Sequence, residues 1–243
     1  MAGHSKWANI KRKKAKVDAQ RGKIFTRLSK EILLAAKLGG GDPTGNMRLK
    51  TAIEKAKEAN IPNENIQRAI LKGTGQLGTS NMEEIVYEGY GPNGVAVLLN
   101  ITTDNRNRTA GEVRHIFSKN GGNLGESGCV SWMFERKGLL VIEKESSSIV
   151  EDELMMLALD AGAEDIRDED EVFEVYTTPE NFEAVLTKLE QGGITFVEAE
   201  MAMIPTTTVK LRGDDAEKVI KLIDLLEEHD DVDDVYTNFE YEA

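Results

Sequence analysis

Residues 139–203 decide the fold, and they read LLVIEKESSSIVEDELMMLALDAGAEDIRDEDEVFEVYTTPENFEAVLTKLEQGGITFVEAEMAM. Short runs rich in Val, Ile and Phe alternate here with runs whose apolar residues recur every three or four positions. This pattern predicts strand 139–142, helix 149–161, strands 164–166 and 172–177, helix 180–191 and strand 195–203. The β-α-β-β-α-β order is that of the ferredoxin-like fold.

The segments on either side of this unit also alternate between strands and helices. We expect strands 84–90 and 95–102, helix 109–119 and strand 129–134 before it, and strand 207–211, helix 215–227 and strand 235–240 after it. Without this unit, each of the two flanking pieces contains a β-α-β arrangement. We therefore predict that residues 137–204 form a third domain, inserted into a discontinuous second α+β domain of residues 81–136 and 205–243.

Residues 1–80 predict a basic helical domain. Ile24, Leu28, Ile32 and Ala35 lie at helical spacing, and the stretch Gly39–Pro43 ends their helix. A second helix would bury Leu49, Ala52, Ile53 and Ala56, and a third, opened by Pro62 and Asn63 and stopped by Gly73, would bury Ile66, Ala69 and Ile70. The fold class is α+β: an N-terminal three-helix domain followed by two ferredoxin-like α+β domains, the third inserted into the second.

Charge divides the chain into two unlike parts. Residues 1–80 carry 17 Lys and Arg against 6 Asp and Glu, a net of +11, whereas residues 81–243 carry 13 against 37, a net of −24. Lys16, Lys23, Arg27, Lys30 and Lys37 fall on the side of the first helix opposite its apolar stripe. This polarity favours binding of a polyanion at the N-terminal end over a plain solvated face.

The composition argues against several other classes of protein. No apolar run approaches the roughly 20 residues of a membrane span, and the N-terminus lacks the apolar core of a secretory signal. Cys129 is the only cysteine, which fits a reducing compartment, and the three histidines have no metal-ligand spacing. The Lys-rich start faintly suggests an organelle transit peptide, but it runs directly into a helix, so we expect a cytoplasmic protein without a metal or cofactor.

The strongest functional signal is the segment Lys6–Lys16, KWANIKRKKAK. Five of the six residues from Lys11 to Lys16 are basic, so charge surrounds any helix that they form, and phosphates would neutralise it. Trp7 would either stack on an exposed base or anchor the segment against the bundle.

Two loops invite comparison with phosphate sites. The stretch GGGDPTGN, residues 39–46, lacks the GK[ST] ending of a P-loop and lies between helices, so a helix-stopping loop explains it better. In Asn105–Thr109, Arg106 and Arg108 stand at a predicted helix start, where they would hold a phosphate or else pair with neighbouring carboxylates. We favour function for the two arginines and capping for Asn107 and Thr109.

No catalytic constellation emerges. The glycine-dense stretch Gly121–Cys129 does not match a nucleophile elbow, and Cys129 is expected to face a core. The acidic runs 168–171 and 230–234 lack the layout of a calcium loop and are interpreted as solvated loops that repel nucleic acid. We therefore expect no enzyme, no small-molecule substrate and no membrane partner.

Several strings strongly resemble the YebC family across nearly the whole chain: AGHSKWANI (2–10), KIFT (23–26), GGGDP (39–43), EVRH (112–115), GGNLG (121–125) and VSWMF (130–134). Cys129 departs from the Ser or Ala that is usual at its position. The resemblance implies an N-terminal helical domain and two α+β domains. Members are commonly described as DNA-binding transcriptional regulators, whereas mitochondrial relatives and some bacterial members look like translation factors that act at the ribosome.

The sequence thus predicts a non-enzymatic, nucleic-acid-binding regulator of gene expression. A DNA-binding transcriptional regulator is the first hypothesis, and a translation factor on ribosomal RNA is the alternative. A third hypothesis, an adaptor that docks an acidic protein, stays open. The residues expected to contact nucleic acid are Lys6, Trp7, Lys11, Arg12, Lys13, Lys14, Lys16, Arg21, Lys23, Arg27, Lys30, Arg106 and Arg108.

Overall fold

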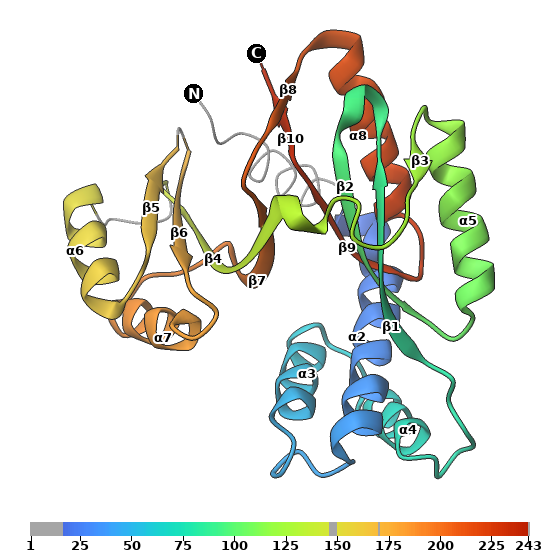
Figure 1. Cartoon of the computed structure of the whole chain (residues 1–243). Coiled ribbons are helices and arrows are strands. Elements are labelled where there is room, and N and C mark those ends of the chain that lie inside the picture. The colour runs from blue at the N-terminus through green and yellow to red at the C-terminus, as the bar shows by residue number, and fades with distance from the viewer. Residues whose placement is uncertain (1–16, 146–149, 170, 243) are drawn as a thin grey trace.

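The computed structural model describes residues 17–145, 150–169 and 171–242. Three units are apparent in Figure 1: a helical bundle at the bottom, an α+β domain at the upper right and a second α+β domain at the left. This arrangement confirms the predicted α+β class, with a helical N-terminal region followed by β-rich domains. In the described part of the chain, no helix combines the length and apolarity needed to cross a membrane.

The helical bundle consists of α2 (Val17–Gly39), α3 (Met47–Glu58) and α4 (Asn63–Gly73). The predicted core positions of α3 and α4 pack into one cluster, in which Ile53 is only partly buried, and Ile32 and Ala35 of α2 join them. Ile24 does not: it is exposed, because the N-terminal half of α2 continues beyond the bundle and runs alongside the neighbouring α+β domain (Figure 1).

The GGGDPTGN loop joins α2 to α3 and is held from within. Asn46 is buried, and its side-chain amide donates to the carbonyl oxygens of Ala35 (2.8 Å) and Gly40 (2.9 Å). Its side-chain oxygen accepts from the backbone N–H of Leu49, which caps α3. A Cβ on Gly39 would lie 2.5 Å from the Asn46 amide nitrogen, so only glycine lets the end of α2 pack this closely against the Asn46 side chain. The structure thus supports the helix-stopping interpretation of this loop.

The second domain is discontinuous in sequence. Its first part contains β1 (Glu83–Tyr90), β2 (Ala96–Thr103), α5 (Arg106–Lys119) and β3 (Asn123–Leu124). Its second part contains β8 (Val209–Leu211), α8 (Gly213–Glu227), β9 (Val232–Thr237) and β10 (Phe239–Tyr241). The main sheet has the order β3-β1-β2-β9 with antiparallel neighbours, and β8 pairs with β10. Helices α5 and α8 pack on one face of the main sheet.

The third domain contains β4 (Phe134–Glu143), α6 (Glu151–Ala161), β5 (Asp165–Asp168), β6 (Val172–Thr177), α7 (Phe182–Gln191) and β7 (Glu198–Pro205). Its sheet is antiparallel with the order β5-β6-β4-β7, which confirms the β-α-β-β-α-β unit. A hydrophobic cluster joins the other face of the second domain's sheet, through Ala96, Leu98 and Tyr236, to this third domain. The exact domain boundaries stay predictions.

The predicted strand 129–134 is wrong. Residues Ser131–Met133 form a short 3-10 helix, and β4 begins only at Phe134. The cause is Glu88, a buried carboxylate of β1 that accepts backbone N–H groups from Gly128, Cys129 (3.0 Å) and Ser131 (2.9 Å). Because these N–H groups are used by a side chain, they are not free to join a β-ladder.

We expect opposite effects from two Gly→Ala substitutions in the bundle. A Cβ on Gly73 would lie 2.3 Å from the Leu33 carbonyl oxygen, so Gly73→Ala separates α4 from α2 and lowers the free energy of unfolding by about 1–3 kcal/mol. Gly22 lies in α2 with open space around its position. Gly22→Ala therefore raises the free energy of unfolding by up to about 1 kcal/mol, because alanine favours the helix more than glycine does. Urea denaturation monitored by circular dichroism measures both; equal effects would contradict the close α2–α4 packing.

Candidate nucleic-acid interface

The predicted cationic row of α2 faces the second domain of the same chain. Lys30 donates through Nζ to Asp231 Oδ1 (2.7 Å) and to the carbonyl oxygens of Asp230 (2.8 Å) and Thr102 (3.1 Å). Arg27 pairs with Asp234 Oδ1 at 2.5 Å. The acidic run 230–234, expected to be a solvated loop, instead neutralises these cations.

Asp231 is the centre of this contact. Its carboxylate is buried and accepts through Oδ2 from Arg108 Nη2 (2.7 Å) and Thr109 Oγ1 (2.8 Å), in addition to Lys30. Burial alone would raise the pKa of this carboxyl, but the hydrogen bonds from Lys30, Arg108 and Thr109 outweigh it and hold the pKa well below its ordinary value. A buried anion therefore ties α2 of the bundle to α5 and β9 of the second domain.

The two predicted arginines at the start of α5 also have carboxylate partners. Arg106 Nη2 lies 3.1 Å from Glu83 Oε2, and Arg108 contacts Asp104 at 3.2 Å besides Asp231. Of the two alternatives for these arginines, intramolecular pairing is the one that the structure displays. Lys37 donates to the carbonyl oxygen of Met82 at 2.8 Å.

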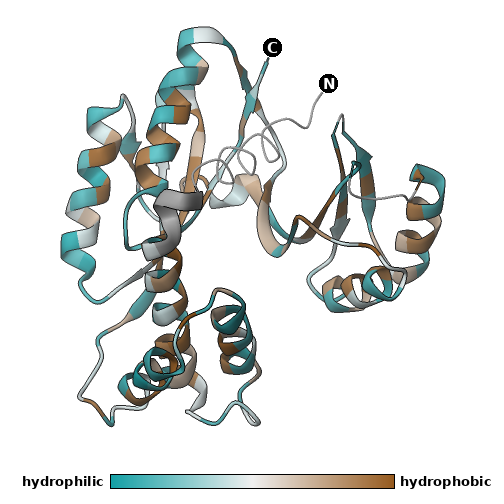
Figure 2. Cartoon of the chain, turned by 180° about the vertical axis from the view of Figure 1, so that it is seen from behind, coloured by the Kyte–Doolittle hydropathy of each residue, from teal (hydrophilic) through white to brown (hydrophobic). Residues whose placement is uncertain are grey.

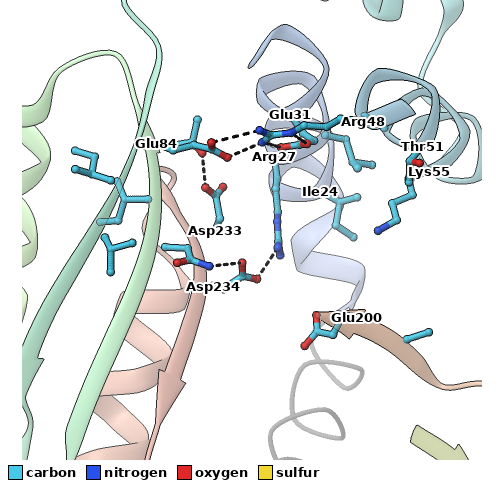
Figure 3. Close-up of a pocket in the computed structure, with 18 of the residues that line it drawn as sticks. Ile24, Arg27, Glu31, Arg48, Thr51, Lys55, Glu84, Glu200, Asp233 and Asp234 are labelled. Atoms are coloured by element: carbon cyan, nitrogen blue, oxygen red, sulfur yellow. Dashed lines mark hydrogen bonds and ion pairs between the residues drawn. The ribbon is translucent and has the colours of Figure 1, made fainter. Parts of the chain in front are cut away.

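A second clamp between bundle and sheet was not foreseen from the sequence. Arg48 of α3 donates to both carboxylate oxygens of Glu31 (2.7 and 3.0 Å) and reaches Glu84 of β1 at 2.5 Å (Figure 3). The hydrogen bonds that Arg48 donates to Glu31, and then those to Glu84, raise the pKa of Arg48 above its ordinary value. No short-range spacing links residues 31, 48 and 84, so only the tertiary fold brings them together.

A groove of about 880 Å³ lies beside these clamps, between the bundle and the two sheets. Figure 3 shows that Ile24 and Arg27 of α2 and the carboxylates Asp233, Asp234 and Glu200 line it, with Arg27 bonded to Asp234. The charged side chains on the sheet side of the groove are all carboxylates, so it is unsuited to a phosphate backbone.

The bundle also exposes cations on α3 and α4. Five of them have no ion pair within the described ranges: Lys50, Lys55, Lys57, Arg68 and Lys72. The site residues predicted from the sequence do not include them, although each lies off the buried positions of its helix, which was the available signal. Arg68 and Lys72, four residues apart, share one face of α4.

The rest of the predicted site is only partly described. Lys6, Trp7, Lys11, Arg12, Lys13, Lys14 and Lys16 lie outside the described residues, as does the side chain of Arg21. Lys23 is half-buried in α2 and takes part in an interaction. The basic N-terminal segment therefore stays a prediction that the structure does not test.

One cluster of potential metal ligands lies within the described residues, at Glu112, His229 and Asp231. His229 Nε2 lies 2.9 Å from Glu112 Oε2, and its Nδ1 accepts the backbone N–H of Asp231 at 3.1 Å. Because both ring nitrogens are engaged and the Asp231 oxygens serve Lys30 and Arg108, the cluster is a network of hydrogen bonds and ion pairs.

Cys129 is partly buried against the core between the two sheets, as expected. Burial, with a smaller contribution from Glu88, raises the pKa of its thiol, which keeps it protonated at neutral pH. A protonated thiol is a poor nucleophile.

Comparisons with known proteins cover almost the entire chain. Residues 5–76 match the family model described as "TACO1/YebC protein N-terminal domain", and residues 82–239 match "TACO1/YebC second and third domain". Proteins named "Probable transcriptional regulatory protein" from Pelotomaculum thermopropionicum and Desulforamulus reducens are 64% and 62% identical, each over 100% of both chains. A crystal structure of a conserved hypothetical protein from Aquifex aeolicus is 51% identical, with a TM-score of 0.82 and 94% of each chain covered.

We expect Asp231→Asn to lower the free energy of unfolding by about 1–3 kcal/mol at neutral pH, because it leaves Lys30 without its buried anion while Arg108 stays partly solvated. The pKa of Asp231 is lowered in the folded state, so its stabilising effect is present at neutral pH and fades as the pH falls below about 4. Urea denaturation at several pH values tests this.

The exposed Asp160→Asn serves as the matched control, with a change within about 0.5 kcal/mol. A destabilisation by Asp231→Asn that stayed constant down to pH 3 would contradict the role of the charge.

Proposed function

The chain belongs to the TACO1/YebC family, and we propose that it is a non-enzymatic regulator of gene expression that binds nucleic acid through its N-terminal helical domain. The observation that carries this proposal is the charge asymmetry, +11 over residues 1–80 against −24 over residues 81–243. A polyanion is attracted to the bundle and repelled by the rest of the chain, which fixes the end that binds.

The contact surface that we propose joins the basic segment Lys11–Lys16 to the outer faces of α3 and α4. Acidic side chains of the second domain already neutralise Arg27, Lys30 and Arg108. Of the five exposed cations of α3 and α4, Lys55 lines the acidic groove, whereas the other four have no such competitor in the described part of the chain. Phosphate contacts made by these side chains would supply affinity with little sequence preference.

DNA is the nucleic acid that we favour, with transcription as the regulated step. The relatives named above are called transcriptional regulatory proteins, and the start of α4 exposes Asn63, Asn65, Gln67 and Arg68. Side chains of these types read base edges when a helix enters the major groove.

A translation factor on ribosomal RNA is the second candidate. The feature that favours it is the Trp-bearing basic segment Lys6–Lys16, since an aromatic ring among cations suits unpaired bases of folded RNA. Both candidates act in the cytoplasm and need neither a cofactor nor a small-molecule substrate.

We expect the double substitution Arg68→Gln and Lys72→Gln to weaken binding to a 30-base-pair DNA duplex and to reduce the slope of log K against log salt by about 2. Removal of two phosphate contacts is the reason, and fluorescence anisotropy from 50 to 200 mM salt is the measurement. Arg114→Gln with Lys119→Gln, on α5, makes the same charge change elsewhere and should leave the slope unchanged. Equal slopes for both pairs would remove α4 from the interface.

Sucrose-gradient sedimentation of lysate, with and without DNase, separates the two candidates. A DNA-binding regulator migrates with DNase-sensitive material and leaves the ribosomal fractions empty. Migration with ribosomes that resists DNase and is lost at high salt would replace the transcriptional assignment with the translational one.

A further inference from the structure

Helix α6 of the third domain carries apolar residues on its outer side. Met155, Met156 and Leu159 are exposed at helical spacing, with 64% of Met156 and 51% of Leu159 open to solvent, and Val150 precedes them at the N-cap. They form one contiguous stripe, which we call the α6 stripe: Met155, Met156 and Leu159. Figure 2 shows α6 at the right-hand edge of the molecule, with tan and brown turns.

The opposite side of the same helix is already satisfied. Leu154 and Ala158 are fully buried in the core of the third domain, and Leu157 and Ala161 pack partly against it. The α6 stripe is therefore not needed to hold the helix on its sheet. A surface helix normally places polar residues on its outer side, so a second apolar side indicates contact with something else.

Acidic side chains border the α6 stripe. Glu151, Asp152, Glu153 and Asp160 are exposed on the same helix and have no ion pair within the described ranges. The whole segment 137–204 carries 4 Lys and Arg against 18 Asp and Glu, a net of −14. Such a field repels nucleic acid and anionic lipid surfaces and attracts cationic partners.

We propose that the α6 stripe and its acidic border bind a cationic amphipathic helix of a partner protein. The apolar face of that helix would pack on Met155, Met156 and Leu159, while its Lys and Arg residues would meet the carboxylates on either side. Methionine side chains adapt to varied apolar surfaces, which suits a docking site of this kind. Helix α6 lies far from the helical bundle in Figure 1, so both ends of the molecule can be occupied together.

The test uses the full-length chain and a fluorescent 18-residue peptide of Leu and Lys, with Leu at helical spacing. A scrambled peptide of the same composition has the same charge but no apolar face. We expect the amphipathic peptide to bind at least about tenfold more tightly than the scrambled one in anisotropy titrations. Equal binding of the two peptides would show attraction by charge alone and would overturn the proposal.

The variant Met156→Gln with Leu159→Gln tests the site itself. Both side chains are exposed, so the fold should tolerate the change, and the net charge stays the same. We expect a loss of at least about tenfold in affinity for the amphipathic peptide. Met47→Gln with Leu77→Gln, two exposed apolar residues of the N-terminal domain, is the matched control and should bind like the original chain. Unchanged binding by the α6 variant would overturn the proposal.

Two further measurements distinguish docking of a partner helix from DNA binding and from self-association. DNA binding by the α6 variant should equal that of the original chain, so the result does not depend on the proposed function. Light scattering after size-exclusion chromatography measures self-association of the chain alone. A dimer that the α6 variant abolishes would make a second copy the occupant and overturn the assignment to a partner protein.

Discussion

The buried carboxylate of Asp231 is the interaction on which the relation between the domains depends. Removal of an anion from water costs several kcal/mol unless cations and hydrogen-bond donors replace the lost solvent. Here the donors come from two domains: Lys30 belongs to α2 of the bundle, and Arg108 and Thr109 belong to α5. The Asp231 Oδ1 atom has the Lys30 donor only while the bundle sits on the sheet. The position of α2 therefore follows from the chemistry of one side chain, and Arg48 reinforces it through Glu31 and Glu84.

This contact changes the meaning of the charge pattern. A count along the sequence locates an excess of cations in residues 1–80, but it cannot tell which cations already have partners. The structure assigns Arg27 and Lys30 to the acidic run 230–234, about 200 residues away. The cations left for an external polyanion lie on α3 and α4, where, apart from Arg48, they have no carboxylate partner in the described part of the chain. The N-terminal domain is still the basic end of the molecule. Its unpaired positive charge, however, lies on α3 and α4 and not on the predicted face of α2.

The sequence predicted those features that local periodicity controls. The core positions of α3 and α4 and the β-α-β-β-α-β order of the inserted unit depend on residues close together in the chain, and they are confirmed. The strand expected at 129–134 failed because Glu88, some 40 residues earlier, takes the N–H groups that a strand needs. The predicted burial of Ile24 is wrong because α2 is longer than the bundle, so its N-terminal half has no bundle helix to pack against. Both failures depend on the tertiary arrangement, which the periodicity of a local segment does not report.

Competition between carboxylates and phosphates decides which cations serve the proposed function. Salt screens exposed charges much more than buried ones, so the pair of Arg27 and Asp234, with 48% of the Arg27 side chain exposed, weakens first as salt rises. The pair of Lys30 and Asp231, with 14% and 8% exposed, is sheltered. A phosphate would have to displace a buried, hydrogen-bonded carboxylate to reach Lys30, whereas it meets Arg68 or Lys72 in open solvent. We therefore expect nucleic acid to bind α4 while Asp231 holds the bundle against the second domain. The contact between the two domains then stays unchanged on binding.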